Sequence, residues 1–567
     1  MRLDGRMVGL STWDVEVDVV VVGSGAGALT AAIVAHDKGA KVIVLEKTDK
    51  AGGASAVSGG AVWVPNNRFI REGFQPEFWD PDRGEWVKAP DSEDKAFKYM
   101  KAIAAGRSSD ELIRTYLRTV SEACDYLEKN THVKWSHVKL MPDYFPEWEG
   151  GVKGGRVMEA QLISFNSLPK EVAERVRLSP VSLPILLEEL VEWGGLATMM
   201  SGRWDFNLIN ERLKERFYGW GTALIARLLY SCYERGIDIR YNTPAKRLIV
   251  EGGRVVGVVA GHEGKELRIR ARKGVILATG GFEWHEKMPS AFLRGPMRGP
   301  MSPPHNTGDG HRMAMEVGAQ VDLMCEAWWF PTVYTGDSYD GKPYYRGIFF
   351  EKVLPGVIIV NKYGKRFANE GANYFDFTRA MHTWDPNRHE YPNIPAWMIF
   401  DERVHQSYTI FTLYPGAEPT DPPFKWADTL RDLARKAGID PDGLEETVER
   451  FNRYAKEGVD PDFHRGESYF DRFYGDPNWK PNPTLGPLEK PPFYAIEVYP
   501  GCLGSCGGLK INEKAQVLDY NDKPIPGLYA AGNVTAAVSG GGYPSSGITI
   551  GAGICFGYIA ANEVTKK

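Results

Sequence analysis

The sequence predicts an α/β fold in which a first domain is interrupted by a second one. A β-branched run at 17–22 leads directly into the glycine-rich turn at 23–27, a pattern typical of a buried strand followed by a helix. Near the C-terminus a related strand-and-glycine pattern returns at 527–533. From about residue 326, the composition changes to aromatic residues, proline and mixed strand and helix signals. Because 567 residues exceed one ordinary domain, we expect both ends of the chain to build one domain together.

The first elements form a strand–helix–strand unit. Residues 17–22, Val-Asp-Val-Val-Val-Val, are expected to form a strand buried on both faces of a parallel sheet. Residues 26–38 are rich in alanine and are followed by Gly39, which predicts a helix and its C-terminal end. Residues 41–45 predict the second strand. A unit of this kind begins a Rossmann-like domain.

The following elements are predicted from composition and turn signals. In chain order they are a small-residue segment at 53–67, helices at 92–130, a loop at 131–160, helices at 181–235, a hairpin at 246–260, a buried strand at 274–279 and a proline-rich connection at 475–492. The 181–235 stretch is unusually apolar and aromatic. Its Glu188, Glu189 and Glu192 exclude a bilayer span, and a packed helical insertion is the favoured interpretation, with monotopic membrane contact as the alternative.

These elements predict the domain organisation. Residues 1–325 are expected to form a nucleotide-binding domain that carries the insertion at about 181–235. Residues 326–490 are expected to form an α+β cap domain, and residues 491–567 to return to the first domain. Ligands often bind at such domain interfaces.

The composition excludes several classes of protein. A net charge of −5 argues against a nucleic-acid partner held through its phosphates. The first apolar run contains Asp18 and leads into the glycine turn, unlike a signal peptide. The six cysteines form no CxxC pair, and Cys502 and Cys506 lack partners at metal-ligand spacing, so we expect a reduced, cytoplasmic protein without a metal site.

The glycine turn predicts a dinucleotide site. Gly23 permits the tight turn from strand to helix, and Gly25 lets the backbone approach a pyrophosphate that meets the free N–H groups of the helix, from Ala26 and Gly27 onward. Ala28 occupies the third position of the fingerprint, where a small residue lets the helix pack on the strand. Glu46, followed by Lys47, is placed to accept hydrogen bonds from ribose hydroxyls.

Further motifs favour FAD over NAD. Ala-Thr-Gly-Gly at 278–281 and Gly-Leu-Tyr-Ala-Ala-Gly-Asn at 527–533, in this order, resemble FAD flavoproteins of the fumarate reductase/succinate dehydrogenase type. The resemblance implies cofactor contacts from Gly53, Ala54, Ser55, Ser58, Gly59, Gly60, Ala278, Thr279, Gly280, Asn306, Asp309, Gly532, Asn533, Gly547 and Ile548. Some members attach FAD through a histidine of the early glycine-rich segment. No histidine lies between His36 and His132, so non-covalent FAD is expected.

One motif of that family is altered. Fumarate reductases need cationic groups for a dicarboxylate, including a histidine before a Thr-Met-Gly-Gly stretch. The matching stretch here is Cys-Leu-Gly-Ser-Cys-Gly-Gly at 502–508, which has no histidine. A neutral substrate is therefore implied.

Three tyrosines stand in motifs that resemble those of 3-ketosteroid Δ1-dehydrogenases. Tyr543 lies in Gly-Tyr-Pro-Ser-Ser-Gly, which matches Tyr-Pro-Gly-Pro-Gly of that family except at Ser545 and Ser546. Tyr374 ends Arg-Phe-Ala-Asn-Glu-Gly-Ala-Asn-Tyr, and Tyr144 lies in Asp-Tyr-Phe-Pro-Glu. Glu-Ala-Trp-Trp at 326–329 and Asn-Thr-Gly-Asp-Gly at 306–310 also match.

The resemblance implies a role for each group. Tyr543 and the Gly547 amide would polarise a 3-ketone, and Tyr374 would remove the C2 proton with help from Tyr144. Flavin N5 would accept the C1 hydride. Met141 and Phe350 are expected in the substrate pocket. Judged singly, a tyrosine is far more often a structural aromatic that hydrogen-bonds locally, and it is the motifs that favour a catalytic role.

The favoured function is dehydrogenation of a 3-ketosteroid at C1–C2, with an external electron acceptor such as a quinone or another carrier. The apolar insertion suggests a substrate with a long side chain, such as a cholestenone, and contact with a membrane surface. The alternatives are dehydrogenation of another cyclic ketone or of another steroid bond, such as C4–C5, and an enoate reductase of the fumarate reductase type. A flavin or sterol binder without turnover is the remaining, less favoured, alternative.

Overall fold

The computed structural model describes residues 13–195, 198–199 and 202–566. Its larger sheet has the strand order β10-β2-β1-β13-β12-β11, with β23 paired to β13 and β22 paired to β23. The strands are β1 (Val15–Val22), β2 (Val42–Leu45), β10 (Asp238–Arg240), β11 (Ala245–Glu251), β12 (Arg254–His262), β13 (Lys265–Leu277), β22 (Gln516–Leu518) and β23 (Pro524–Ala530). The pairs β10–β2, β2–β1, β1–β13 and β13–β23 are parallel, as in a nucleotide-binding sheet.

Burial explains why the predicted strand–helix–strand unit forms. Val19, Val20 and Val21 of β1 are fully buried, as expected for a parallel strand that is covered on both faces. Helix α1 (Ala26–Asp37) is buried along its first ten residues and packs against α17 (Ile548–Thr565). The α/β fold class predicted from the sequence is therefore confirmed, and β11 and β12 confirm the predicted hairpin.

A second sheet is entirely antiparallel and has the order β16-β15-β20-β18-β17, with β19 paired to β20. Its strands are β15 (Ala327–Tyr339), β16 (Lys342–Gly347), β17 (Ile358–Asn361), β18 (Ala396–Asp401), β19 (Phe424–Ala427) and β20 (Phe493–Ser505). β20 belongs to the segment predicted to return to the first domain, yet it pairs within the second sheet. The second sheet therefore extends beyond the 326–490 segment.

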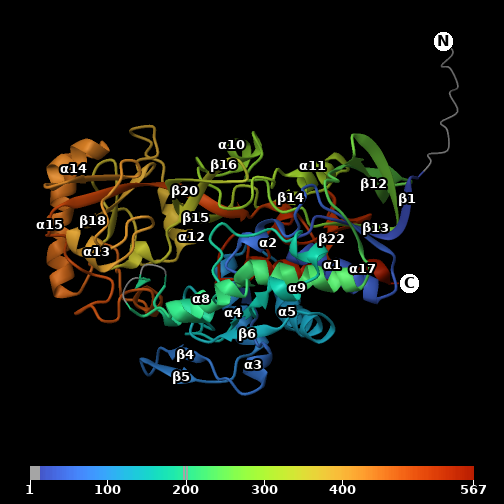
Figure 1. The fold of residues 1–567 in the computed structure, drawn as a ribbon, viewed down its shortest axis with the longest axis horizontal. Helices are drawn as coiled ribbons and strands as arrows, with labels where there is room; N and C mark the ends of the chain where they lie inside the picture. The colour runs from blue at the N-terminus through green and yellow to red at the C-terminus, as the bar shows by residue number, and fades with distance from the viewer. Residues whose placement is uncertain (1–12, 196–197, 200–201, 567) are drawn as a thin grey trace, which may run out of the picture.

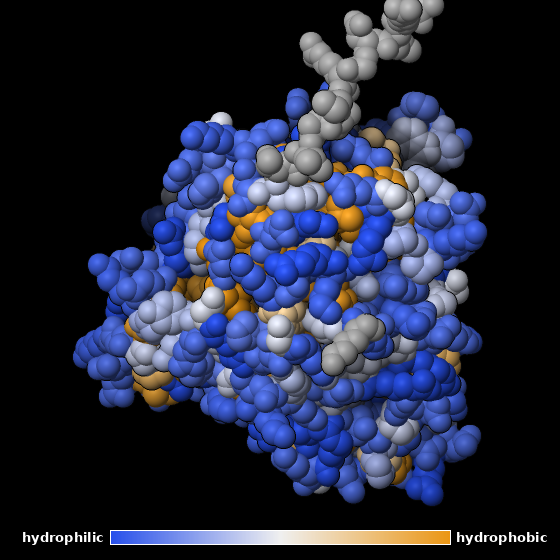
Figure 2. Space-filling view, turned by 90° about the vertical axis from the view of Figure 1, so that its right-hand side faces the viewer, coloured by the Kyte–Doolittle hydropathy of each residue, from blue (hydrophilic) through white to orange (hydrophobic). Residues whose placement is uncertain are grey.

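The two sheets lie side by side along the longest axis of the molecule (Figure 1). β12, β13 and the C-terminal helix α17 lie at one end, and β18 with α14 (Leu430–Ala437) and α15 (Pro441–Glu457) lies at the other. β15 and β20 lie between these ends. Seen from the first of these ends, the surface is largely hydrophilic around a central area of apolar residues (Figure 2).

Helices cover the first sheet on the side toward the bottom of Figure 1. The residues predicted as helical at 92–130 form two helices, α4 (Glu93–Ala104) and α5 (Asp110–Asn130), because Ala105 adopts a left-handed φ of 49° and Ser109 caps the second helix. The stretch 181–235 contains α7 (Leu187–Glu192), α8 (Phe206–Lys214) and α9 (Trp220–Glu234).

One prediction was wrong. The segment 131–160, expected to be a loop, contains β6 (Trp135–Val138) and β7 (Val157–Ala160), which pair with each other, and β7 also pairs with β3 (Val62–Trp63). All four residues of β7 are buried. These strands are stabilised by partners from elsewhere in the chain, which the local proline and aromatic composition does not reveal.

Among the described residues, one helix is long and apolar enough to cross a membrane by length and composition. This helix is α17, and 61% of its most apolar stretch is buried inside the protein. It packs against α1 and α5. Its apolar composition is therefore that of an interior helix.

Candidate active site

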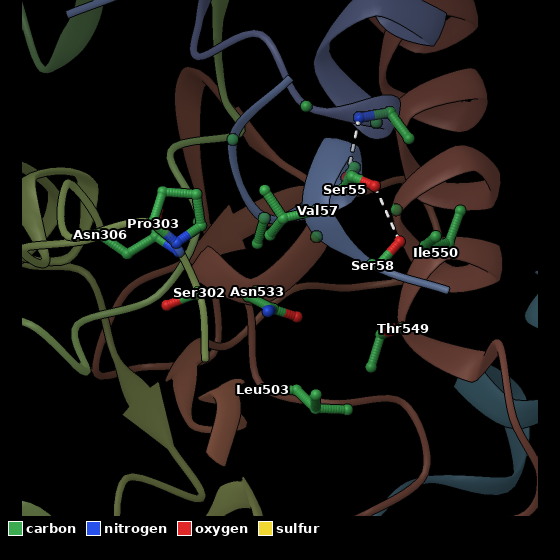
Figure 3. A pocket seen from close by; sticks show the side chains of 18 of the residues that line it. Ser55, Val57, Ser58, Ser302, Pro303, Asn306, Leu503, Asn533, Thr549 and Ile550 are labelled. Carbon is green, nitrogen blue, oxygen red and sulfur yellow. Dashed lines mark hydrogen bonds between the residues drawn. The ribbon is translucent and has the colours of Figure 1, made fainter. Parts of the chain in front are cut away.

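A cavity of about 390 Å³ lies where the two sheets meet. Its wall combines the turn after β1, the segment around α2 (Gly53–Val57), residues of the second sheet and the N-terminal part of α17. Figure 3 shows this arrangement: Ser55 and Val57 come from the N-terminal part of the chain, Ser302 and Asn306 from its middle, and Thr549 from α17. The volume is within the range of small-molecule and cofactor sites.

Glycines shape the end of the cavity that lies over β1. Gly23 adopts a φ of 108°, and a Cβ at this position would collide with the carbonyl oxygen of Ala278. A Cβ at Gly27 would stand 2.6 Å from the carbonyl oxygen of Gly553, so α1 and α17 touch through their backbones. The N-cap residue of α1, Gly25, has no side chain, and Ser55 Oγ of the cavity wall accepts from the Ala26 N–H at 3.2 Å. The N-terminus of α1 thus lies at the cavity, where its N–H groups favour a phosphate group.

An acidic side chain follows β2 at the same end of the cavity. Glu46 is 8% exposed and accepts hydrogen bonds from Ser24 Oγ at 2.5 Å and from the Thr48 backbone N–H at 2.8 Å. Lys47 donates to Asp309 at 2.8 Å, so its charge is neutralised within the wall. The carboxylate is held in place, and Glu46 lines the cavity, which is the arrangement expected of an acid that binds a ribose.

Nearly all residues predicted for the cofactor line this one cavity. They are Gly23, Gly25, Ala26, Gly27, Ala28, Glu46, Lys47, Gly53, Ala54, Ser55, Ser58, Gly59, Gly60, Ala278, Thr279, Gly280, Asn306, Asp309, Gly532, Asn533 and Gly547. Ile548 does not line it, and instead lines a neighbouring cavity of about 20 Å³. Met141, Phe350, Tyr374 and Tyr543 also line the main cavity, whereas Tyr144 lies directly behind the tyrosines of the wall.

The three predicted tyrosines form one cluster. The ring of Tyr144 lies 5.6 Å from that of Tyr374 and 5.2 Å from that of Tyr543, and the rings of Tyr374 and Tyr543 are 5.5 Å apart. The Tyr144 hydroxyl is hydrogen-bonded to Ser546 Oγ at 3.1 Å. Residues that are far apart in the sequence thus bring three phenol groups together at the cavity.

Burial controls the ionisation of this cluster. It raises the pKa of Tyr543 to about 12 and the pKa values of Tyr144 and Tyr374 well above the ordinary value. The neighbouring hydroxyls of Tyr144 and Tyr543 raise the pKa of Tyr374 further. All three groups are therefore neutral phenols at pH 7 and can act as hydrogen-bond donors.

The motif that precedes Tyr374 is explained by its contacts. Tyr374 begins α12 (Tyr374–Met381), and the side-chain nitrogen of the buried Lys352 donates to the carbonyl oxygens of Glu370, at 2.6 Å, and of Ala372. Arg366 makes two hydrogen bonds with the Glu370 carboxylate, at 2.8 and 2.6 Å. Buried charges thus hold the loop that presents Tyr374 to the cavity.

The loop that carries Tyr543 is held by backbone contacts. The Pro544 carbonyl accepts from the Tyr144 backbone N–H at 2.9 Å and from the Tyr99 hydroxyl at 2.6 Å. Gly547 adopts a φ of 100° at the N-terminus of α17, which disfavours any residue with a Cβ. Ser546, which departs from the family pattern, is the partner of the Tyr144 hydroxyl.

Sequence reasoning missed several wall residues. Trp328 stands edge-on to Tyr543 with ring centroids 5.0 Å apart, and its indole N–H donates to Asn533 at 3.1 Å. Phe330 stacks on Tyr374 at 4.0 Å. Trp328 lies within the Glu-Ala-Trp-Trp motif, which could have identified it. The one sequence signal for Phe330 is the alternation of side chains along a strand. Trp328 and Phe330 are two positions apart on β15 and therefore lie on the same face.

The chain matches a model of the FAD binding domain family over residues 18–550. It belongs to this family. It is 39% identical to the 4-oxocyclohexanecarboxylate 2-dehydrogenase of Sinomonas cyclohexanicum, over 97% of this chain and 93% of the relative. It is 38% identical to a 3-oxosteroid 1-dehydrogenase of Mycolicibacterium smegmatis, over 97% of each chain. The crystal structure of the 3-ketosteroid Δ1-dehydrogenase from Sterolibacterium denitrificans has 37% identity and a TM-score of 0.87, over 97% of this chain and 99% of that one.

These relatives establish the general reaction. The protein is an FAD-dependent dehydrogenase of cyclic ketones. The cavity fits FAD, because a glycine turn, the N-terminus of α1 and a buried acid all contribute to its wall. The predicted cofactor is therefore confirmed.

The charged groups of the dehydrogenase are concentrated at one end of this cavity. Among the described wall residues, the basic side chains are Lys47, Arg177 and His305. Arg177 donates to Thr48 at 3.1 Å and pairs with Asp340, which also contacts His305. Each basic group thus has an acidic partner, and two of them lie beside the Glu46 segment. The tyrosine end is lined mainly by aromatic and aliphatic side chains, together with the uncharged polar side chains of Asn533, Ser546 and Thr549.

Proposed function

We propose that the dehydrogenase introduces a double bond between C1 and C2 of a 3-ketosteroid. The observation that carries this proposal is the cluster of Tyr144, Tyr374 and Tyr543 at an apolar end of the cofactor cavity. The relatives that support it include 3-oxosteroid 1-dehydrogenases at 38% identity.

Two groups are suited to polarising the ketone. The Tyr543 hydroxyl is a donor, because its pKa of about 12 keeps it protonated, and the Gly547 N–H lies at the start of α17. Together they would donate hydrogen bonds to the carbonyl oxygen, on which negative charge develops as the C2 proton leaves. The positive end of the α17 dipole adds to this stabilisation.

Tyr374 is proposed to take the C2 proton. As a neutral phenol it must give up its own proton at the same time, and Tyr144 lies beside it to receive that proton. Tyr144 would pass its hydroxyl proton to Ser546, to which it is hydrogen-bonded at 3.1 Å, as Ser546 releases its own hydroxyl proton to water in the cavity. This relay avoids a free phenolate in a buried site. Bound FAD supplies the acceptor for the C1 hydride.

The size and polarity of the wall support a large apolar substrate. Leu187 and Leu190 of α7 and the nearby Val181 line the cavity, so the apolar insertion contributes to it directly. The competing substrate class, an oxocyclohexanecarboxylate, would require a cation for its carboxylate. The basic residues of the wall, Lys47, Arg177 and His305, are already paired with acids.

The decisive experiment is an anaerobic titration of the holoenzyme with three ketones, followed by loss of the flavin absorbance. The ketones are 4-cholesten-3-one, 4-androstene-3,17-dione and 4-oxocyclohexanecarboxylate. Bleaching by the steroids with a 1,4-dien-3-one product is expected. Bleaching by the carboxylate alone would refute the steroid proposal and favour the second class, and a product lacking the C1=C2 bond would refute the site of reaction.

The insertion is also proposed to contact a membrane surface, from which a sterol and a quinone acceptor could be drawn. Phe206 and Leu213 of the insertion support this, since they are 43% and 54% exposed, and Leu178, just before the insertion, is 43% exposed. Cosedimentation with phosphatidylcholine vesicles tests it. Binding that is lost in Phe206→Ser/Leu213→Ser is expected, and absence of binding by the unaltered enzyme would refute it.

A further inference from the structure

A buried carboxyl group lies behind the cavity wall, at a position that the proposed reaction does not use. Glu283 is 3% exposed, and its Oε1 accepts hydrogen bonds from Ser302 Oγ at 2.5 Å and from Asn306 Nδ2 at 2.7 Å. Its Oε2 accepts the backbone N–H of Ser505 at 3.0 Å. All three donors are uncharged, and two of the residues that supply them, Ser302 and Asn306, line the cavity.

These contacts determine which way the Asn306 amide points. A carboxylate oxygen can only accept hydrogen bonds, so the Asn306 atom that faces Glu283 is the amide nitrogen. The carbonyl oxygen, Oδ1, is therefore turned away from Glu283, and it stands 2.8 Å from where a Cβ on Gly280 would lie. Gly280 and Asn306 both line the cavity. Figure 3 shows Asn306 on the same side of the cavity as Ser302 and Pro303.

We propose that Glu283 is a positioning residue that makes the wall present a hydrogen-bond acceptor, Asn306 Oδ1, to an O–H or N–H group of bound FAD. An uncommitted amide could turn either its donor or its acceptor toward the cofactor. The buried carboxyl removes that choice, at the cost of desolvating an acidic group. The inference rests on the cofactor and not on the steroid reaction, so either can fail without the other.

The arrangement does not depend on the charge of Glu283. Burial raises the pKa of this carboxyl, and the hydrogen bonds from Ser302 and Asn306 act in the opposite direction. If the carboxyl takes up a proton, its O–H group can donate a hydrogen bond to Ser302 Oγ, because a hydroxyl both donates and accepts. The Ser505 N–H and the Asn306 amide nitrogen continue to donate in either state.

Glu283→Gln tests the inference. An amide nitrogen at the Oε2 position would face the Ser505 N–H, donor against donor. The new amide is therefore expected to place its nitrogen at the Oε1 position, which forces Asn306 to turn its own nitrogen toward FAD. One buried hydrogen bond is then lost, and the Asn306 amide nitrogen faces a donor group of FAD. This predicts about tenfold to a hundredfold weaker FAD binding. The measurement is the FAD dissociation constant, from the flavin fluorescence released on dilution of the holoenzyme.

A double variant separates positioning from general damage. In Glu283→Gln/Asn306→Asp, one aspartate oxygen accepts from the new amide and the other again offers an acceptor to FAD. Affinity is expected to return to within about threefold of the unaltered enzyme, which is roughly 0.7 kcal/mol. Failure of the double variant to recover affinity would overturn the proposal, as would unchanged affinity in Glu283→Gln.

Two further variants complete the test. Asn306→Ala keeps Glu283 and its contacts with Ser302 and Ser505, and it is expected to weaken FAD binding as much as Glu283→Gln does. FAD affinity unchanged in Asn306→Ala would overturn the proposal even if Glu283→Gln does not fold. Glu159→Gln is the matched control, because Glu159 is also fully buried but caps α7 through the N–H groups of Leu187 and Glu188. Its FAD affinity is expected to be unchanged, and an equal loss would show that the effect is not specific to Glu283.

Discussion

Removal of a single oxygen atom tests the proposed chemistry most directly. Tyr543→Phe keeps the ring, which packs against Trp328 at 5.0 Å, Tyr144 at 5.2 Å and Tyr374 at 5.5 Å, and it removes only the donor proposed for the ketone. Because the ring contacts remain, the free energy of unfolding should fall by no more than about 1 kcal/mol, the net value of one hydrogen bond.

The effect on rate should be far larger. Loss of one preorganised donor at a developing oxyanion lowers kcat by about a hundredfold to a thousandfold, which is roughly 2.7–4 kcal/mol. The loss should not be complete, since the Gly547 N–H is still in place. Stopped-flow measurement of flavin reduction by saturating 4-androstene-3,17-dione, without oxygen, reports this step in isolation.

A neighbouring tyrosine provides the control. Tyr474 is 6% exposed and packs against Phe349 and Phe350 of the cavity wall, with ring distances of 4.8 and 5.6 Å. Its buried hydroxyl makes no hydrogen bond within the described part of the chain. Tyr474→Phe should therefore leave flavin reduction unchanged. A rate loss under tenfold in Tyr543→Phe, or an equal loss in both variants, would refute the reasoning.

Three other outcomes follow from the site. Tyr374→Phe should abolish exchange of the C2 hydrogen with solvent deuterium and slow flavin reduction by about a thousandfold or more, whereas exchange at the usual rate would exclude Tyr374 as the base. Tyr144→Phe should slow flavin reduction by about tenfold to a hundredfold, and the rate of the variant should rise more steeply with pH because the relay is broken; identical pH profiles would count against a relay. Burial raises the pKa of Glu159 to about 8, so the folded state holds a proton that the unfolded state releases near pH 4.5. The protonated carboxyl therefore contributes to the free energy of unfolding at low pH, and this contribution is lost as the pH rises from 4.5 to 8. Chemical denaturation across this range should show a decline in the unaltered protein that is shallower in Glu159→Gln, and parallel curves would contradict the assignment.

Local patterns determined much of the cofactor site. The β-branched strand, the small-residue helix and the acid at Glu46 specify a strand–helix–strand unit through nearest neighbours alone, so the sequence predicted them and the structure confirms them. The tyrosines were recognised through motifs that resemble a known family, and the structure places their rings within 5.6 Å of one another.

Other features depend on contacts between distant segments. The strands β6 and β7 were missed because their stability comes from pairing with each other and with β3, across a proline-rich stretch that by itself favours a loop. β20 pairs with β15 and β18, although its sequence lies in the segment expected to rejoin the first domain. No local pattern indicates which sheet a strand will join, because hydrogen-bond partners are chosen by the whole fold.

By itself, the sequence determined a dinucleotide fold, its FAD fingerprint and the identity of the phenol groups. Only the tertiary structure decided how these groups work together. It buried the tyrosines and raised their pKa values, it paired the basic wall residues with acids, and it placed Glu283 behind Asn306. Burial and orientation arise when segments hundreds of residues apart exclude water from a common surface, and a linear pattern of residue types carries no record of that geometry.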